Sequence, residues 1–314
     1  MSTEPALASS GSPSVIEARG LRHVYRGGTV ALDGVELAFG TGLYGLLGPN
    51  GAGKSTFMRI VCTLLVPTAG TVTVLGHDVI RDRRGARRTL GYLPQEFGAW
   101  RLERVEEVLD TLARIAGMND AATRRQRIEQ VLTQVGLDGV ADRKVKKLSG
   151  GMVRRLGVAQ ALLHEPRVLV VDEPTVGLDP QERLRFRQLM ANLGQDRTIL
   201  LSTHIVADLG ASCRDLALID GGKIVFRGSP AELVARAVGR VFQIEERGAA
   251  SVEAKFEVVS RVRDGTVTRL RAVARDAVLP AGAEPVSDPT LEEAYLAFMA
   301  ARGRAELAVL EEVS

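Results

Sequence analysis

The order of hydrophobic and polar positions along the chain predicts strands and helices in alternation. Short apolar runs bounded by glycine or charged residues are typical of strands. Such runs occupy residues 15–25, 31–39, 43–47, 71–75, 168–171, 198–202 and 216–220. The run at 168–171 is apolar throughout, as expected for a central parallel strand that is covered on both faces. Strands that alternate with helices indicate an α/β fold with a mostly parallel sheet.

Helical periodicity dominates a different stretch, about residues 96–154. Apolar residues recur at intervals of three and four between Leu102 and Ile115, and again between Ile128 and Val135. This spacing places them on one face of a helix, and Gly136 is suited to end the second helix at its C-cap. We therefore expect a helical insert inside the α/β region.

The character of the chain changes after about residue 228. Ser229-Pro230-Ala231-Glu232 and Thr290-Leu291-Glu292-Glu293 are both typical of helix N-termini with a capping box. Between them, the turn dipeptide Asp264-Gly265 predicts a hairpin. Residues 229–314 are thus expected to form a small α+β accessory region without evident chemistry. Residues 1–14 are rich in Ser, Ala and Pro and are expected to be a disordered tail.

The composition narrows the class of protein. Lys and Arg number 41 against 38 Asp and Glu, and this near balance argues against a dedicated nucleic-acid binder. The arginine-rich run at 81–88 is therefore interpreted as a solvated helix face rather than a nucleic-acid or lipid surface. Cys62 and Cys213 lack metal-type spacing and are expected to be buried thiols. No run of about 18 apolar residues occurs, so no transmembrane helix is expected.

The strongest chemical signal is a glycine-rich segment between the apolar run at 43–47 and an apolar helical stretch at 57–65. It consists of Gly48, Pro49, Asn50, Gly51, Ala52, Gly53, Lys54, Ser55 and Thr56, and it fits the phosphate-binding pattern G-x-x-x-x-G-K-[ST]. Glycines let backbone N–H groups wrap an anion, and the following helix points its positive end at that anion. Lys54 supplies charge for the β- and γ-phosphates, and the Ser55 hydroxyl can ligate Mg²⁺. The segment therefore predicts nucleotide binding.

Two adjacent carboxylates, Asp172 and Glu173, follow the apolar run at 168–171. At the tip of a buried strand, Asp172 could hold Mg²⁺ and Glu173 could polarise the attacking water as a general base. An ordinary strand followed by a charged turn would give the same local pattern. The phosphate-binding segment upstream favours the catalytic interpretation.

A further candidate anion site is the helix start at Ser149, Gly150 and Gly151, which offers free N–H groups and a hydroxyl. Alone, this triplet would usually be an ordinary helix cap. However, a phosphate loop, then Leu-Ser-Gly-Gly at 148–151 and then Asp-Glu-Pro at 172–174 is an order that resembles the ATP-binding-cassette (ABC) ATPases. The resemblance covers about residues 15–228. It implies a P-loop NTPase cassette with a mostly parallel sheet, a helical insert and antiparallel β elements.

Four more positions match motifs of that family, and their roles are implied by the resemblance. Tyr25 matches the aromatic that stacks on adenine, and Gln95 matches the glutamine that contacts magnesium and the attacking water. Asp179 lies in a segment similar to the loop that crosses the dimer interface, and His204 matches the histidine that senses the γ-phosphate. Taken alone, Tyr25 could be a strand-end aromatic, Gln95 a solvent-facing loop residue and His204 a capping side chain.

One position departs from the commonest form of the family signature, which has Gln where this chain has Met152. Methionine cannot make the hydrogen bonds of an amide. We therefore expect altered contacts to the sugar but retained ATP binding. Because Glu173 is present, the resemblance implies a site that hydrolyses ATP.

The resemblance also implies partners. In this family the signature of one chain closes over the phosphate loop of another, and this chain carries one set of motifs. We therefore expect a head-to-tail pair with a second ATPase subunit, as a homodimer, around two molecules of ATP with Mg²⁺. We also expect an integral-membrane permease subunit on a separate polypeptide, a peripheral position at the cytoplasmic face of the cell membrane, and no nucleic-acid partner.

Two classes of function are compatible with these motifs: the motor subunit of a membrane transporter, or a soluble cassette ATPase that acts on ribosomes or DNA. The second kind usually carries two cassettes or long coiled coils, so the single compact cassette favours transport. The short helical insert, Met152 and the segment 288–295 resemble exporters of the ABC-2 type. An importer motor is the alternative within the transporters.

Overall fold

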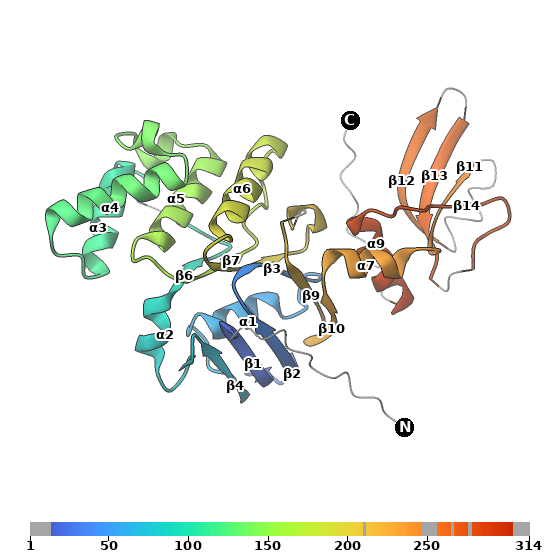
Figure 1. Cartoon of the computed structure of the whole chain (residues 1–314), viewed down its shortest axis with the longest axis horizontal. Helices are drawn as coiled ribbons and strands as arrows, with labels where there is room; N and C mark the ends of the chain where they lie inside the picture. The colour runs from blue at the N-terminus through green and yellow to red at the C-terminus, as the bar shows by residue number, and fades with distance from the viewer. Residues whose placement is uncertain are drawn as a thin grey trace. The chain divides into compact units, whose positions relative to one another are not determined.

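The structure is a computed structural model, and it describes residues 14–98, 100–209, 212–245, 256–264, 267–275 and 278–303. Residues 1–13 of the expected tail and Gly265 of the expected turn lie outside these ranges. The contacts within the chain divide it into two compact units at Arg227 and Gly228. Each unit is described by itself (Figure 1).

The first unit is organised around a six-stranded sheet with the order β10-β9-β3-β8-β7-β6. Its strands are β3 (Gly42–Leu47), β6 (Leu90–Leu93), β7 (Val168–Asp172), β8 (Thr198–Thr203), β9 (Asp215–Asp220) and β10 (Lys223–Gly228). The pairings from β9 through β3, β8 and β7 to β6 are all parallel, which confirms the predicted α/β fold with a mostly parallel sheet. Every residue of β7 is buried, as its apolar sequence predicts.

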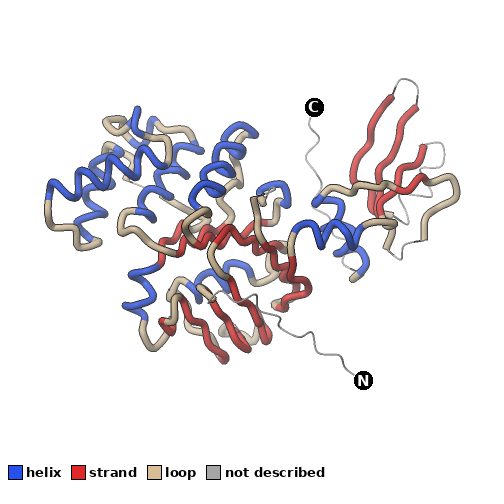
Figure 2. Tube along the Cα trace, in the orientation of Figure 1, coloured by secondary structure: helices blue, strands red, loops and turns tan. Residues whose placement is uncertain are grey.

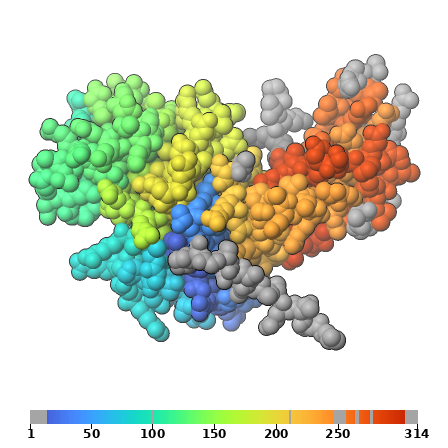
Figure 3. All heavy atoms as spheres, in the orientation of Figure 1, coloured from blue at the N-terminus to red at the C-terminus, as the bar shows by residue number. Residues whose placement is uncertain are grey.

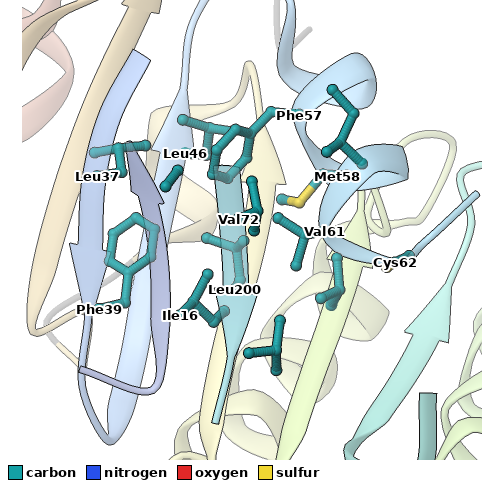
Figure 4. Packing of buried hydrophobic residues seen from close by; sticks show 14 of the residues in the cluster. Ile16, Leu37, Phe39, Leu46, Phe57, Met58, Val61, Cys62, Val72 and Leu200 are labelled. Carbon is teal, nitrogen blue, oxygen red and sulfur yellow. The ribbon is translucent and has the colours of Figure 1, made fainter. Parts of the chain in front are cut away.

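A second, antiparallel sheet belongs to the same unit and has the order β2-β1-β4-β5. It consists of β1 (Ile16–Val24), β2 (Val30–Phe39), β4 (Ala69–Val74) and β5 (His77–Asp78). Helix α1 (Lys54–Val61) contacts strands of both sheets. Phe57 and Met58 of this helix are fully buried in a cluster with residues of both sheets, among them Phe39 and Leu200 (Figure 4). The helix that follows the phosphate-binding segment is therefore fixed by packing on two sides.

The predicted insert is helical in its described residues. It contains α3 (Val105–Ile115), α4 (Ala121–Gln134) and the start of α5 (Gly150–Leu162), with short 3₁₀ turns at 138–140 and 145–147. Figure 2 shows these helices in blue beside the red strands of the sheet, and in Figure 3 they form one continuous green body. Gly136 adopts the left-handed conformation, with φ +65°, as predicted for a C-cap. Helix α3 begins later than the apolar pattern predicts, and Leu102 stays exposed.

The described residues of the first unit also form α2 (Arg83–Thr89), α6 (Pro180–Leu193) and the 3₁₀ turn Val206–Asp208. The arginine-rich run forms α2, and most of its residues are exposed. Burial raises the pKa of the Cys62 thiol above its usual range and that of Cys213 to about 12, so both cysteines stay protonated as buried thiols. Within the described part of the chain, no helix combines the length and apolar character needed to cross a bilayer.

The second unit is a small α+β structure. Its antiparallel sheet has the order β12-β13-β11-β14. The elements are α7 (Pro230–Ala237), β11 (Val241–Glu245), β12 (Glu257–Asp264), β13 (Val267–Val273), β14 (Glu284–Pro285) and α9 (Leu291–Ala301). Both predicted capping boxes are present, at Ser229 and Thr290. Strands β12 and β13 pair as the predicted hairpin. Glu293 of α9 forms an ion pair with Arg271 of β13 and so ties the helix to the sheet.

The position of α1 between two sheets generates a prediction about stability. Phe57→Ala removes a fully buried ring and should lower the free energy of unfolding by about 3–5 kcal/mol, because the surrounding core cannot close the cavity. Leu64→Ala, just beyond the same helix, is the control. Leu64 is 58 % exposed, so its truncation should change the free energy by less than about 0.5 kcal/mol. Urea unfolding measures both, and equal losses would contradict this account of the core.

Candidate active site

The phosphate-binding segment connects β3 to α1, and two of its glycines are enforced by close backbone neighbours. A Cβ atom on Gly48 would lie 2.2 Å from the carbonyl oxygen of Ile219, and one on Gly53 would lie 2.5 Å from that of Ala31. Gly53 also has φ +111°, a conformation that L side chains rarely adopt. The fold thus holds the loop against β2 and β9 through positions where only glycine fits.

The loop leads directly into the N-terminus of α1. Gly53 is the N-cap residue, and no side-chain hydrogen bond caps the helix. The backbone N–H groups of the first turn therefore remain available to an anion at the positive end of the helix dipole. Ser55 lies in this turn and is half-buried. This is the geometry that the sequence pattern predicts.

Lys54 is buried, and its ammonium group has three oxygen neighbours. Nζ donates to the carbonyl oxygens of Gly48 at 2.7 Å and Pro49 at 3.1 Å, and it lies 3.1 Å from Oε1 of Glu173. An ammonium has three N–H donors, so these three contacts use its whole capacity. A phosphate oxygen that binds Lys54 must take the place of one of these oxygens.

Glu173 follows β7 and contacts two other predicted site residues, Lys54 of the phosphate-binding segment and His204. One carboxylate oxygen faces Lys54, and the other, Oε2, lies 2.6 Å from Nδ1 of His204. Its backbone is in the left-handed region, with φ +47°, which costs about 1–2 kcal/mol for a residue other than glycine. The backbone N–H of Glu173 donates to the carbonyl and hydroxyl oxygens of Ser202 on β8, and this holds the strained residue in place.

Asp172 is buried at the end of β7 and accepts a short hydrogen bond from the Ser202 hydroxyl. Sequence reasoning missed Ser202, although it directly precedes the Thr203-His204 pair at the end of a predicted strand. Gln95 lies just beyond β6, which pairs with β7 in the same sheet. It is exposed, and its carbonyl oxygen accepts from the guanidinium of Arg154 on α5. The strand order therefore brings these segments to one edge of the sheet.

Tyr25 lies next to the loop, at the end of β1. Its hydroxyl is 3.0 Å from the Thr56 hydroxyl on α1, and its ring meets the edge of the His23 ring at a centroid distance of 4.6 Å. The side chain remains partly exposed. The aromatic ring of Tyr25 therefore lies beside the first turn of α1, the helix that follows the phosphate-binding segment.

Ser149, Gly150 and Gly151 form the start of α5. The Ser149 hydroxyl caps the helix by accepting from the Met152 N–H at 3.2 Å, and Ser149 and Gly150 are exposed. Asp179 caps α6 in the same way, by accepting from the Glu182 N–H at 2.9 Å, and it is exposed too. The predicted signature and the predicted interface loop thus both present a helix N-terminus to solvent.

Glu182 connects these two helix starts, and sequence reasoning missed it. Its buried carboxylate pairs with Arg155 of α5 at 3.5 Å and with Arg185 at 2.6 Å. A Cβ atom on Gly151 would lie 2.1 Å from this carboxylate. A side chain at the second glycine of the predicted signature would therefore force the Glu182 side chain of α6 to move.

This geometry and the order of its motifs define a P-loop nucleoside triphosphatase. Residues 32–176 match the family described as "ABC transporter". The Nod factor export ATP-binding protein I of Ralstonia nicotianae is 39 % identical over 238 residues, which cover 75 % of this chain and 74 % of that protein. The probable multidrug ABC transporter ATP-binding protein YbhF of Escherichia coli is 37 % identical over 198 residues, 63 % of this chain and 34 % of that protein.

Solved structures of ABC transporter ATP-binding proteins have a similar fold. The cbiO1 protein of Clostridium perfringens, described as part of an ABC transporter complex, superposes with a TM-score of 0.64 at 26 % identity. It covers 71 % of this chain and 92 % of its own length. The bacterial ABC transporter cassette MJ0796, solved as a dimer, gives a TM-score of 0.62 at 25 % identity, with coverages of 68 % and 98 %. The chain belongs to the ATP-binding proteins of ABC transporters. It binds ATP and is an ATPase, as the sequence predicts.

The tight contact between Gly48 and β9 generates a second prediction. Gly48→Ala places a methyl group against the Ile219 carbonyl, so the loop must move away from its position at α1. We expect ATP binding to weaken about tenfold or more, because each hydrogen bond lost to a charged group removes about 1.5 kcal/mol or more. Titration with a fluorescent ATP analogue measures the change. Gly139→Ala, where a Cβ meets no atom within 4 Å, is the control and should bind as the parent protein does.

Proposed function

We propose that this chain is one of two ATPase subunits that drive a transporter whose membrane-spanning subunit is a separate polypeptide. The observation that carries the proposal is the exposure of Ser149 and Gly150 at a capped helix start. An exposed anion-binding helix end in a chain with one phosphate loop is suited to the nucleotide of a second subunit. The dimeric cassette among the similar structures supports this arrangement.

We assign the contacts to ATP as follows. The segment 48–56 binds the phosphates through its backbone N–H groups, which Pro49 lacks, and through the Lys54 ammonium, and the ring of Tyr25 stacks on the adenine. From the other subunit, Ser149, Gly150 and Gly151 contact the γ-phosphate, and Asp179 lines the interface. The uncapped start of α1 and the position of Tyr25 beside it support these roles.

The residues at the sheet edge fit a magnesium ion. Ser55, Gln95 and Asp172 offer hydroxyl, amide and carboxylate oxygens, which are the ligands that Mg²⁺ prefers. Among the described residues no cluster of His, Cys, Asp and Glu could hold a metal alone. This suits Mg²⁺, which typically takes one or two carboxylates together with phosphate oxygens. When bound, the ion would neutralise charge on the phosphates during hydrolysis.

The proposed reaction uses Glu173 as the general base. Its carboxylate accepts a proton from the water that attacks the γ-phosphate, while the phosphate–ADP bond breaks. His204, at 2.6 Å, fixes the orientation of this carboxylate. Because Lys54 lies 3.1 Å from the other carboxylate oxygen, the residue that binds the phosphates is in contact with the residue that activates the water.

We further propose that the transporter is an exporter and that the chain lies at the cytoplasmic face of the cell membrane. The relatives named above are described as export and multidrug proteins, which supports this direction of transport. The membrane-spanning subunit is expected to select the substrate. The nearly balanced charge and the resemblance to transport cassettes disfavour ribosomal or DNA partners.

The role of Glu173 is tested by Glu173→Gln. The amide keeps the shape of the side chain but cannot take up a proton, so ATP turnover should fall about 10²–10⁴-fold. ATP should still bind and should hold two subunits together, which light scattering measures as a dimer. Glu129→Gln, at an exposed position of α4, should retain normal turnover. Near-normal hydrolysis by Glu173→Gln would exclude Glu173 as the general base.

The role of the signature is tested by Ser149→Ala in the Glu173→Gln protein. The variant should bind ATP as a monomer but should form the ATP-dependent dimer at least about tenfold more weakly, because a charge-assisted hydrogen bond is lost. Ser229→Ala is the matched control, because it removes an equivalent cap at the start of α7. There the Glu232 N–H donates to the Ser229 hydroxyl at 3.2 Å. If both variants dimerise like the parent, Ser149 does not contact the nucleotide of the second subunit.

A further inference from the structure

Asp208 is a buried carboxylate that none of the proposed steps uses. It ends the 3₁₀ turn Val206–Asp208, which follows His204, and only 4 % of its surface is exposed. Its Oδ2 atom accepts two hydrogen bonds: a short one from the Thr175 hydroxyl, and one from the Thr203 hydroxyl at 3.1 Å. The carboxylate therefore joins two segments that come from different strands.

Both segments carry a residue of the proposed active site. Thr175 lies two residues after Glu173, and Thr203 directly precedes His204. Both threonines are buried to 99 % or more. A connection between Thr175 and Thr203 through Asp208 therefore lies within two residues of both partners in the contact between Glu173 and His204.

Helix α6 holds the two segments from another side. Arg187 donates to the Ala207 carbonyl at 2.6 Å, and Arg183 donates to the Leu178 carbonyl at 3.0 Å. The two guanidinium groups lower the pKa of Asp208, as the two hydroxyls do. Two hydroxyls and two guanidinium groups, from three parts of the chain, thus lie around this turn.

Stability alone does not explain the carboxylate. Burial outweighs the hydroxyls and arginines, so the pKa of Asp208 is raised above its ordinary value. An acid with a raised pKa in the folded state binds its proton more tightly there than in the unfolded chain. Its contribution to stability is present at low pH and is lost as pH rises through the folded pKa. The raised pKa therefore gives the fold less support as pH rises, and the two hydroxyl contacts point to another role for the carboxylate.

We propose that Asp208 is a positioning residue for ATP hydrolysis, which clamps Thr175 to Thr203 and thereby keeps Glu173 aligned with His204. The proposal rests on the proposed roles of Glu173 and His204. Alignment matters here because Glu173 has a strained backbone with φ +47°, and a released segment can relax away from it. A displacement of about 1 Å in a catalytic group can cost about 100-fold in rate.

The test compares the ATPase kinetics of threonine variants that remove one hydroxyl and keep the side-chain volume. Thr175→Val should lower kcat about 10- to 100-fold, because the clamp opens, while KM for ATP stays within about twofold of the parent, because the clamp does not touch the phosphate loop. Thr175→Ser restores the hydroxyl and should restore most of kcat. Thr198→Val is the matched control. It removes a hydrogen bond of 2.9 Å from the hydroxyl of this buried threonine to the Gly40 carbonyl, at the other end of β8.

Thr198→Val should lose a similar amount of thermal stability to Thr175→Val but should keep normal kcat. A double-mutant cycle adds Asp208→Ala: in its presence, Thr175→Val should have no further effect on kcat, because both changes open the same clamp. The clamp is refuted if Thr175→Val keeps kcat within about twofold, or if Thr175→Ser loses as much activity as Thr175→Val. Normal turnover by Glu173→Gln would instead refute the proposed function, so the two failures are distinguishable.

Discussion

The organisation of the site depends on one side chain, the carboxylate of Glu173, which contacts Lys54 with one oxygen and His204 with the other. This contact joins the end of β7 to the start of α1 and to the end of β8. The backbone of Glu173 is left-handed here, and its N–H donates to the carbonyl and hydroxyl oxygens of Ser202. The parallel order β3-β8-β7 provides the frame, because it brings all three strand ends to the same edge of the sheet.

The packing around this edge explains how the first unit holds the N-terminus of α1 and the loop before it in place. Helix α1 is buried between two sheets, so its N-terminus is held rigidly. The loop before it is fixed by close backbone contacts at Gly48 and Gly53. A phosphate site made of backbone N–H groups can only be as precise as the backbone that carries them. The double-sided core therefore supports the site by holding the backbone of the loop and of α1 in place.

Much of the fold could be predicted from sequence because its signals are local. Apolar runs, capping boxes and the glycine pattern each lie within a few residues, and the strands, helix starts and loop were found where those patterns occur. The contacts of Glu173 with Lys54 and Ser202, and the cluster around Asp208, could not be predicted. They join segments whose proximity is set by strand order, and no short pattern encodes strand order. At Leu102 a local pattern was misleading. Its spacing to later apolar residues predicts a helix, but α3 begins only at Val105.

The contact between Gly151 and Glu182 has a consequence for how such sequences can change over time. Any side chain at 151 would overlap the Glu182 carboxylate, which Arg155 and Arg185 hold in place. A change at 151 therefore needs either a shift of the Glu182 side chain, which alters its ion pairs with Arg155 and Arg185, or a different residue at 182. These three positions are expected to vary together among related chains. Covariation at 151, 155 and 182 would then record a packing constraint on the signature that is separate from its chemistry.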